Sequence, residues 1–221
     1  MNSQYLPSGD TSSLNMNPTH SAFVSMVFFL CICFAGPLTG AHCNPAITLA
    51  LFLTPNSKLT LKTATLYVFS QFLGAMAGGA IAYGLVPYFN FDEEAPSDSN
   101  IRVLLELRIA LAQIAGTFIY TLFVLINYYE NTSFFKATFW VYVSTAFVFF
   151  ISREFTYQLD SLNPATTLAF QVFTGIKNGN WEPLKQYYLY IAGPVIGAIL
   201  CSAFYNFYYE PLLLRWRSPK K

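Results

Sequence analysis

Charged side chains are scarce in this 221-residue sequence. Asp, Glu, Lys and Arg make up only 10% of its residues, hydrophobic side chains make up 54%, and the formal net charge at pH 7 is +1. Such a composition is too apolar for an ordinary soluble domain. The near-zero net charge also argues against a nucleic-acid partner, which requires a basic surface. The composition therefore predicts an integral membrane protein.

Patterns for metal binding and catalysis are also missing. The sequence has two histidines and four cysteines, and neither Cys-x-x-Cys nor His-Glu-x-x-His spacing occurs. We find no nucleophile–base pair and no glycine-rich loop suited to a phosphate. We therefore expect no metal, no cofactor and no enzymatic activity.

The first 20 residues contain no Lys or Arg. A secretory signal peptide begins with basic residues, and a transit peptide is rich in Arg, so residues 1–20 fit neither. We interpret them as a polar N-terminal extension.

Long apolar runs dominate the rest of the chain. A helix needs about 20 apolar residues to cross a bilayer, and five runs approach or exceed that length: 21–38, 62–87, 103–128, 137–153 and 186–209. Two further apolar stretches, 45–53 and 164–173, are too short to cross. We predict five transmembrane helices and two half-helices that enter the membrane and stop near its midplane.

Each short stretch begins with the same tripeptide. Asn44-Pro45-Ala46 opens the first, and Asn163-Pro164-Ala165 opens the second. Asn is a good N-cap and Pro suits the first helical position. Two such helix starts meeting at the midplane would bring together two Asn amides and two positive dipole ends, which favours a neutral hydrogen-bonding solute and repels cations.

The two tripeptides belong to a longer internal repeat with an offset of 119 residues. At this offset Gly74 and Gly78 correspond to Gly193 and Gly197. Glycines four apart let two helices approach closely, so we predict helix packing at both pairs. Duplicated halves of this kind are typical of channels and transporters built from inverted repeats. At this offset the equivalent of run 103–128 would lie before residue 1. We therefore predict that the first repeat, 21–87, lacks its first helix, and that the second repeat, 103–209, contains it.

These motifs resemble the aquaporin, or major intrinsic protein, family. The resemblance rests on the stretch from Gly40 to Ala50, which contains the first tripeptide, on the second tripeptide, and on Gln71-x-x-Gly74-Ala75, Gln113-Ile114-Ala115-Gly116-Thr117 and Gly193-Pro194-x-x-Gly197-Ala198. It implies an all-α membrane protein with an aquaporin-like helical bundle, here of five transmembrane helices and two re-entrant half-helices. It also implies conduction of water or small uncharged solutes, usually by a tetramer.

The resemblance assigns a constriction to four positions, where this chain departs from the family. Thr166 stands where the family commonly has an Arg that donates hydrogen bonds to the solute. Val24 and Ile151 make the expected ring apolar, and such rings can exclude water. Asp160 lies in the same loop, where it either makes the ring more polar or pairs with Arg153 at the surface.

Two further residues are expected to support the re-entrant loops. Gln113 occupies a place where the family often has a buried Glu, and His42 lies beside the first tripeptide. Both are interpreted as residues that order the loop through hydrogen bonds.

Two functions remain open. The main hypothesis is a non-conducting accessory subunit of a larger membrane assembly, whose partner subunits and lipids cover the position of the missing helix; a mitochondrial inner-membrane complex of respiration or ATP synthesis is one such host. A homotetramer is less expected on this hypothesis. The alternative is a working channel for water or small neutral solutes.

The sequence also predicts how the chain divides. We expect a polar extension at 1–20, a transmembrane domain at 21–209 and a basic C-terminal tail at 210–221.

Overall fold

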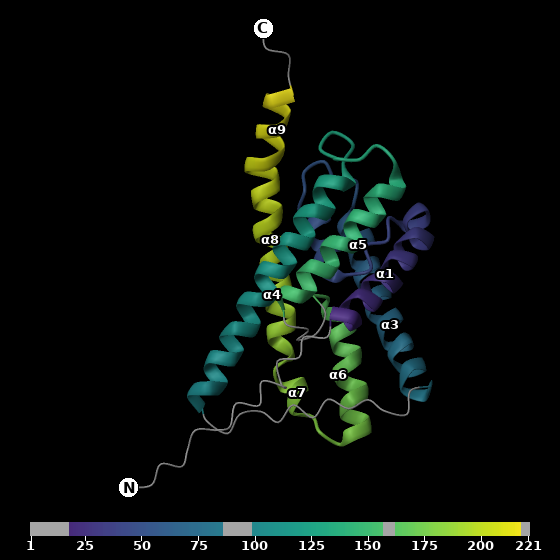
Figure 1. The fold of residues 1–221 in the computed structure, drawn as a ribbon, viewed down its shortest axis with the longest axis vertical. Coiled ribbons are helices and arrows are strands. Elements are labelled where there is room, and N and C mark those ends of the chain that lie inside the picture. Colours follow the sequence, from purple (N-terminus) through teal and green to yellow (C-terminus); the bar gives the residue numbers. More distant parts are fainter. Residues whose placement is uncertain (1–17, 86–98, 157–161, 218–221) are drawn as a thin grey trace.

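The computed structural model describes residues 18–85, 99–156 and 162–217, and these residues form helices joined by short connections. The elements, in chain order, are α1 (Pro18–Thr39), α2 (Pro45–Phe52), α3 (Leu61–Leu85), α4 (Ser99–Tyr128), α5 (Thr138–Phe155), α6 (Pro164–Asn178), α7 (Glu182–Lys185), α8 (Tyr187–Phe204), the π-helical turn η2 (Tyr205–Tyr209) and α9 (Glu210–Arg217). The chain is thus an all-α helical bundle of the predicted kind (Figure 1).

Five long helices, α1, α3, α4, α5 and α8, and two shorter ones, α2 and α6, form at the predicted apolar runs in the described part of the chain. Within the described residues, four segments are long and apolar enough to cross a membrane: Thr19–Thr39, Leu61–Leu85, Val103–Tyr128 and Tyr187–Arg217. The fifth predicted span is α5, which has 18 residues and falls outside that set. Its last turn contains Arg153 and Glu154, which make its end polar.

Several helix ends differ from the predicted boundaries. Helix α1 begins at Pro18, inside the predicted extension, and residues 1–17 lie outside the described part of the chain. Helix α6 continues past residue 173 to Asn178, where Gly179 ends it with a positive φ of 68°. Helix α9 continues the helical path of α8 through the first part of the predicted basic tail, as far as Arg217, and the tail itself stays a prediction. The wide turn η2 precedes Pro211, whose missing N–H would interrupt an ordinary α-helix.

The 119-residue offset recurs in the arrangement of the helices. It relates α1 to α5, α2 to α6 and α3 to α8. Helix α1 packs against α5, and α3 packs against α6 much as α8 packs against α2. Helix α4 packs against α8 and α5, and Figure 1 shows α4 crossing α8. The described residues contain no counterpart of α4 in the first repeat.

The main core lies around α2. Four α2 side chains, those of Ala46, Ile47, Ala50 and Leu51, are buried in one cluster with residues of α4, α5, α8 and η2. The last carbonyl groups of a helix have no partner within that helix. Here Ser202 Oγ donates to Ala50 O at 3.0 Å and Asn206 Nδ2 donates to Leu53 O at 3.1 Å. The end of α2 is therefore held by the α8–η2 segment.

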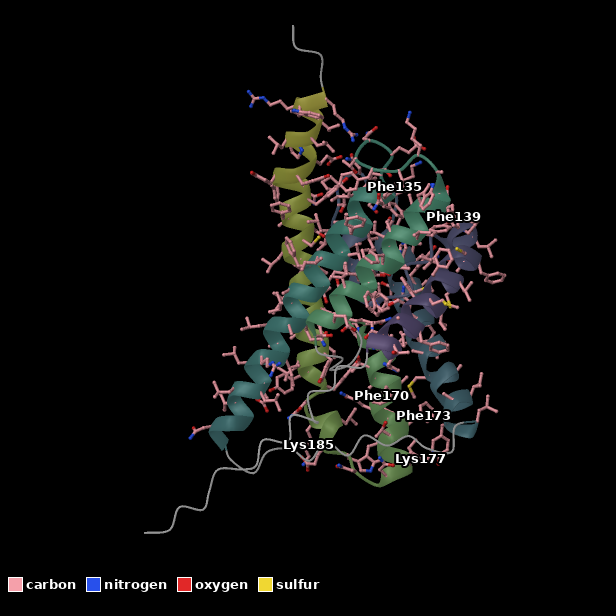
Figure 2. The ribbon with its side chains drawn as sticks, viewed as in Figure 1. Phe135, Phe139, Phe170, Phe173, Lys177 and Lys185 are labelled. Atoms are coloured by element: carbon pink, nitrogen blue, oxygen red, sulfur yellow. The ribbon has the colours of Figure 1, made fainter. Side chains whose placement is uncertain are left out.

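Helices α3 and α6 meet closely at Gly79. A Cβ atom added at Gly79 would lie 2.6 Å from the Phe173 ring. Tyr83, one turn further along α3, has its ring centroid 5.9 Å from that of Phe173 and 5.9 Å from Lys177 Nζ. Figure 2 shows Phe170, Phe173 and Lys177 along the lower part of α6. The side of α3 that contains Gly79 is thus occupied by α6.

Candidate functional site

The two tripeptides start α2 and α6 as their sequences predicted. Asn44 caps α2, with its Oδ1 accepting a hydrogen bond from Ala46 N at 2.8 Å. Asn163 caps α6 in the same way, through Ala165 N at 3.1 Å. In each helix Pro follows the cap, where no N–H is required.

The two caps are also joined to each other's loops. Asn44 Nδ2 donates to Leu162 O at 2.9 Å, and Asn163 Nδ2 donates to Cys43 O at 2.8 Å. These two hydrogen bonds hold the N-termini of α2 and α6 together, and both Asn side chains are buried. We call this pair of linked helix starts the Asn junction. It places two amide groups and two positive helix ends at one point in the bundle.

The loop before α2 has an uncommon backbone. Gly40, Ala41 and Cys43 have φ angles of 76°, 46° and 48°. Positive φ is easy for Gly but costs energy for Ala and Cys, so the surrounding contacts must hold this conformation. Such strain concentrates at functional sites, although it does not by itself identify a function.

His42 is held in this loop by a small hydrogen-bond network centred on Thr48. Thr48 Oγ1 donates to Asn44 O at 3.2 Å and accepts from Gln71 Nε2 at 2.9 Å. Because the single hydroxyl proton is then used, His42 Nδ1, 3.2 Å away, is the donor in the third bond. His42 is 4% exposed, and burial lowers the pKa of this loop residue to about 4. The neutral ring therefore joins the first loop to α2 through Thr48, and its predicted role in ordering the loop stays a prediction.

A cavity opens beside this loop. Its volume is about 90 Å³, and its lining includes the Gly40–His42 loop, Asn127 and Thr145 as polar contributors, and Phe28, Ile47 and Tyr120 as apolar ones. The lining is mostly apolar, with a few neutral polar residues, and a cavity of this size has room for a water-sized molecule. The arrangement suits small uncharged molecules better than an ion, because the groups that line it are neutral.

Three aromatic rings fill the space next to the cavity. The ring centroids of Phe28 and Phe149 are 4.7 Å apart, those of Tyr120 and Phe149 are 5.2 Å apart, and those of Phe28 and Tyr120 are 6.3 Å apart. We call these three residues the aromatic trio. Its members lie in the same cluster as Ala46 of the Asn junction and Leu162. Phe28 and Tyr120 of the trio also line the cavity.

The four predicted constriction residues do not gather into one described group. Val24 packs against the main core, and Ile151 is half-buried on α5. Thr166 is exposed in the first turn of α6, where its hydroxyl donates to Asn163 O at 3.2 Å. Asp160 lies outside the described residues. The constriction stays a prediction.

Gln113 and the paired glycines lie at a helix crossing. Gln113 is fully buried on α4, and a Cβ atom added at Gly193 would lie 2.5 Å from Gln113 Cβ. One added at Gly197 would lie 2.6 Å from Ile114 O. The predicted close packing is thus present at the second glycine pair, and the loop-supporting role of Gln113 stays a prediction.

The first glycine pair differs. A Cβ atom added at Gly74 or Gly78 would meet nothing within 4 Å among the described residues. The helix crossing predicted there is not formed within this part of the chain, because the described residues offer no helix in the place that α4 takes beside α8.

Sequence reasoning missed two features of the site. Gln71 was noted only as part of a motif, although a polar side chain within an apolar run is a signal for a buried hydrogen bond. The aromatic trio had no such signal, because 18% of the residues are aromatic and no spacing distinguishes these three.

Comparisons with known proteins agree with the arrangement around the Asn junction. The family model described as "Major intrinsic protein" matches residues 4–205. "Probable aquaporin PIP2-7" of Oryza sativa subsp. japonica is 32% identical over 206 residues, which cover 90% of this chain and 66% of the relative. "Aquaporin PIP2-7" of Musa acuminata is 29% identical over 191 residues, which cover 84% and 65% respectively.

One relative has a higher sequence identity over a shorter aligned segment. "Aquaporin-5" of Ovis aries is 51% identical over 53 residues, which cover 24% of this chain and 19% of the relative. The chain spans at most about two thirds of the length of these relatives. The family is one of membrane channels and not of enzymes, which supports the absence of enzymatic activity expected from the sequence. Because the family model covers most of its length, this chain, an integral membrane protein, belongs to the major intrinsic protein family, the aquaporins.

Proposed function

We propose that this chain provides a pathway for water or small neutral solutes across its membrane. The observation that carries the proposal is the Asn junction. Asn44 and Asn163 each cap their own half-helix and donate to a carbonyl group of the other loop. Both donors are neutral side-chain amides, the kind of group that binds uncharged hydrogen-bonding solutes.

The electrostatics of the junction favour neutral solutes. Two helix N-termini contribute partial positive charge at one point, which opposes the passage of cations and protons. His42 adds no charge near neutral pH, because burial lowers its pKa to about 4. The names of the relatives also fit this proposal better than a purely structural role.

We expect the aromatic trio to narrow such a pathway. Tyr120 and Phe149 are buried, and Phe28 packs against both. Rings at this position leave little space and offer few hydrogen bonds, so water would pass slowly. We therefore expect a lower permeability than in a channel whose corresponding side chains are small.

Osmotic shrinkage of vesicles that contain the purified chain tests the proposal. Permeability above that of empty vesicles is expected, and it should be lost in Asn163→Asp, because a carboxylate places a negative charge at the junction and cannot donate to Cys43 O. Asn180→Asp is the matched control, since Asn180 lies in an exposed turn before α7. Shrinkage no faster than in empty vesicles would reject the proposal.

An accessory role in a larger membrane assembly is the second candidate. One observation favours it: among the described residues nothing covers the Gly74 and Gly78 side of α3, whereas α4 covers the equivalent side of α8. A chain with an open wall can be kept in an assembly for its shape. On this candidate the vesicles shrink at the background rate, and the chain is recovered from its native membrane only with partner subunits. A mitochondrial host stays within this candidate, and no residue supports it directly.

A further inference from the structure

Three parts of the chain meet at one end of the bundle. They are the connection from α2 to the first turn of α3, the connection from α4 to α5, and α9 (Figure 1). Glu210, at the start of α9, accepts a hydrogen bond from Asn56 Nδ2 at 3.0 Å, and Arg217, in its last turn, donates to Asn131 O. Helix α9 therefore holds the two connections together.

Exposed cations gather on these three parts. They are Lys58, Lys62, Lys136, Arg215 and Arg217, and we call them the basic end. The segments that contain them, 53–64, 129–137 and 210–217, have two acidic residues, Glu130 and the buried Glu210. Five positive and two negative charges give this end a formal net charge of +3. The whole chain has +1, so the rest of the chain is less basic than this end.

The length of the last helical segment indicates how deep the basic end lies in a membrane. Tyr187–Arg217 has 31 residues and is apolar enough to cross a bilayer. At 1.5 Å per residue it is about 46 Å long, whereas the apolar layer of a bilayer is about 30 Å thick. The segment is thus longer than the apolar layer. Its charged last turn, with Arg215 and Arg217, is expected at the level of the lipid headgroups.

Exposed aromatic side chains accompany the cations. Trp216 has a basic residue on each side and is 80% exposed. Phe135 and Phe139, which flank Lys136 in the sequence, are also exposed, and Figure 2 shows both at this end of the bundle. Trp is favoured at the boundary between headgroups and apolar layer, and basic side chains reach from that boundary towards the polar side. Cations beside aromatic rings at this depth fit a lipid surface.

We propose that the basic end binds the headgroups of anionic phospholipids. Arg side chains donate to phosphate oxygens, and a guanidinium has five N–H donors, so Arg217 can hold Asn131 O and a phosphate together. The net positive charge favours a headgroup that keeps a net negative charge over the zwitterionic phosphatidylcholine headgroup. The inference goes beyond conduction, since it holds for either candidate function.

Tryptophan fluorescence in vesicles tests the proposal. The chain has three Trp residues, so Trp140→Phe and Trp181→Phe leave Trp216 as the reporter at the basic end. The full chain with these two changes is placed in mixtures of phosphatidylcholine and phosphatidylglycerol, with bromine on the acyl chains of one lipid. Quenching against lipid composition gives the relative binding of the two lipids beside Trp216. We expect phosphatidylglycerol to bind at least about tenfold more tightly.

The charge of Arg215 should determine much of this preference. Arg215→Gln should lower it about fivefold, because one cation near an anionic surface contributes roughly that factor. Arg215→Lys keeps the charge and should keep most of the preference. Lys185→Gln is the matched control, since Lys185 is also exposed but pairs with Glu182 and lies at the opposite end of the bundle (Figure 2). It should leave the preference unchanged. Circular dichroism of each variant checks that the helices are retained.

Three results would overturn the proposal. Equal binding of the two lipids beside Trp216 would make the basic end a solvated surface without a lipid ligand. A preference that Arg215→Gln leaves unchanged would assign it to other groups. Loss of the preference on adding soluble glycerol phosphate, but not sodium chloride of the same ionic strength, would make the ligand a free phosphate and not a lipid. None of these results depends on whether the chain conducts water.

Discussion

Helices α3 and α8 occupy equivalent places in the two repeats, yet they have different neighbours. The glycines of α8 lie against Gln113, Ile114 and Thr117 of α4, whereas those of α3 meet nothing within 4 Å among the described residues. Almost the same small-residue spacing is thus buried in one half and open in the other. The comparison teaches that a glycine pair in a membrane helix indicates the capacity for close packing, and that a neighbouring helix decides whether the capacity is used.

A matched pair of substitutions gives the largest expected difference between the two halves. Gly197→Ala places a methyl group 2.6 Å from Ile114 O, a backbone atom that cannot easily move. Overpacking of this kind costs about 3 kcal/mol at the upper end of the usual range. Gly78→Ala meets nothing, and it should stabilise the helix by up to about 1 kcal/mol because Ala is the better helix former.

Unfolding of the purified chain in mixed micelles, with the denaturing detergent varied, measures both free energies. The comparison would break if Gly78→Ala destabilised the isolated chain as much as Gly197→Ala did. That outcome would mean that a helix covers α3 within this chain after all.

The two caps of the Asn junction should behave alike, in contrast to the two glycine pairs. Asn44→Ala and Asn163→Ala each remove one helix cap and one hydrogen bond to the opposite loop. Each change should lower the free energy of unfolding by about 1–2 kcal/mol. The double variant should lose less than the sum of the two, because both residues hold the same junction.

Asn180→Ala controls for the loss of an exposed cap, since Asn180 Oδ1 accepts a hydrogen bond from Glu182 N at the surface. It should change the free energy of unfolding little. Strictly additive effects of Asn44→Ala and Asn163→Ala would show that the two half-helices are not coupled through their caps.

The aromatic trio supplies a second contrast between the repeats. Phe28 of α1 lies in the trio, whereas its repeat equivalent, Phe147 of α5, is 61% exposed. If the proposed pathway passes the trio, Phe28→Ala should widen it there. If the barrier falls by about 1 kcal/mol, osmotic permeability rises about fivefold.

Phe147→Ala is the control, because it removes the same ring from the equivalent position outside the core. Stopped-flow light scattering of vesicles compares the two variants at equal protein content. Equal permeability of both variants and the unchanged chain would show that the trio does not limit the flow.

The repeat structure could be predicted from the sequence because it depends on local signals. Asn before Pro starts a helix, and apolar length separates spanning helices from short ones, so Asn44 and Asn163 were placed correctly as caps. The trio and the Thr48 network could not be predicted, because they join residues from different helices. The ends of α6 and α9 were also missed. Helix α6 continues until Gly179 can end it, and α9 forms because the wide turn η2 tolerates Pro211.

The constriction at Val24, Ile151 and Thr166 depended on transfer by resemblance. That step identifies positions but not the direction in which each side chain lies. Thr166 shows the difference, since its hydroxyl donates to Asn163 O of its own helix. A short side chain that satisfies its own backbone cannot replace an arginine that reaches into a pathway.

The loops before the two half-helices should differ slightly in their response to pH. His42 lies in the first loop, and the repeat offset places Ser161 at the equivalent position of the second. Burial lowers the pKa of His42 from 6.5 to about 4, so the unfolded chain takes up a proton more readily than the folded chain as the pH falls. The stability that this neutral ring contributes is present above pH 6.5 and is lost as the pH falls towards 4. Between pH 7 and pH 6 the loss is about 0.7 kcal/mol.

The free energy of unfolding in micelles, measured at both pH values, tests this expectation. His42→Gln should remove that part of the pH dependence. His20→Gln, in the exposed first turn of α1, should keep it. If His42→Gln kept the full slope, the pH response would have to arise from other groups of the chain.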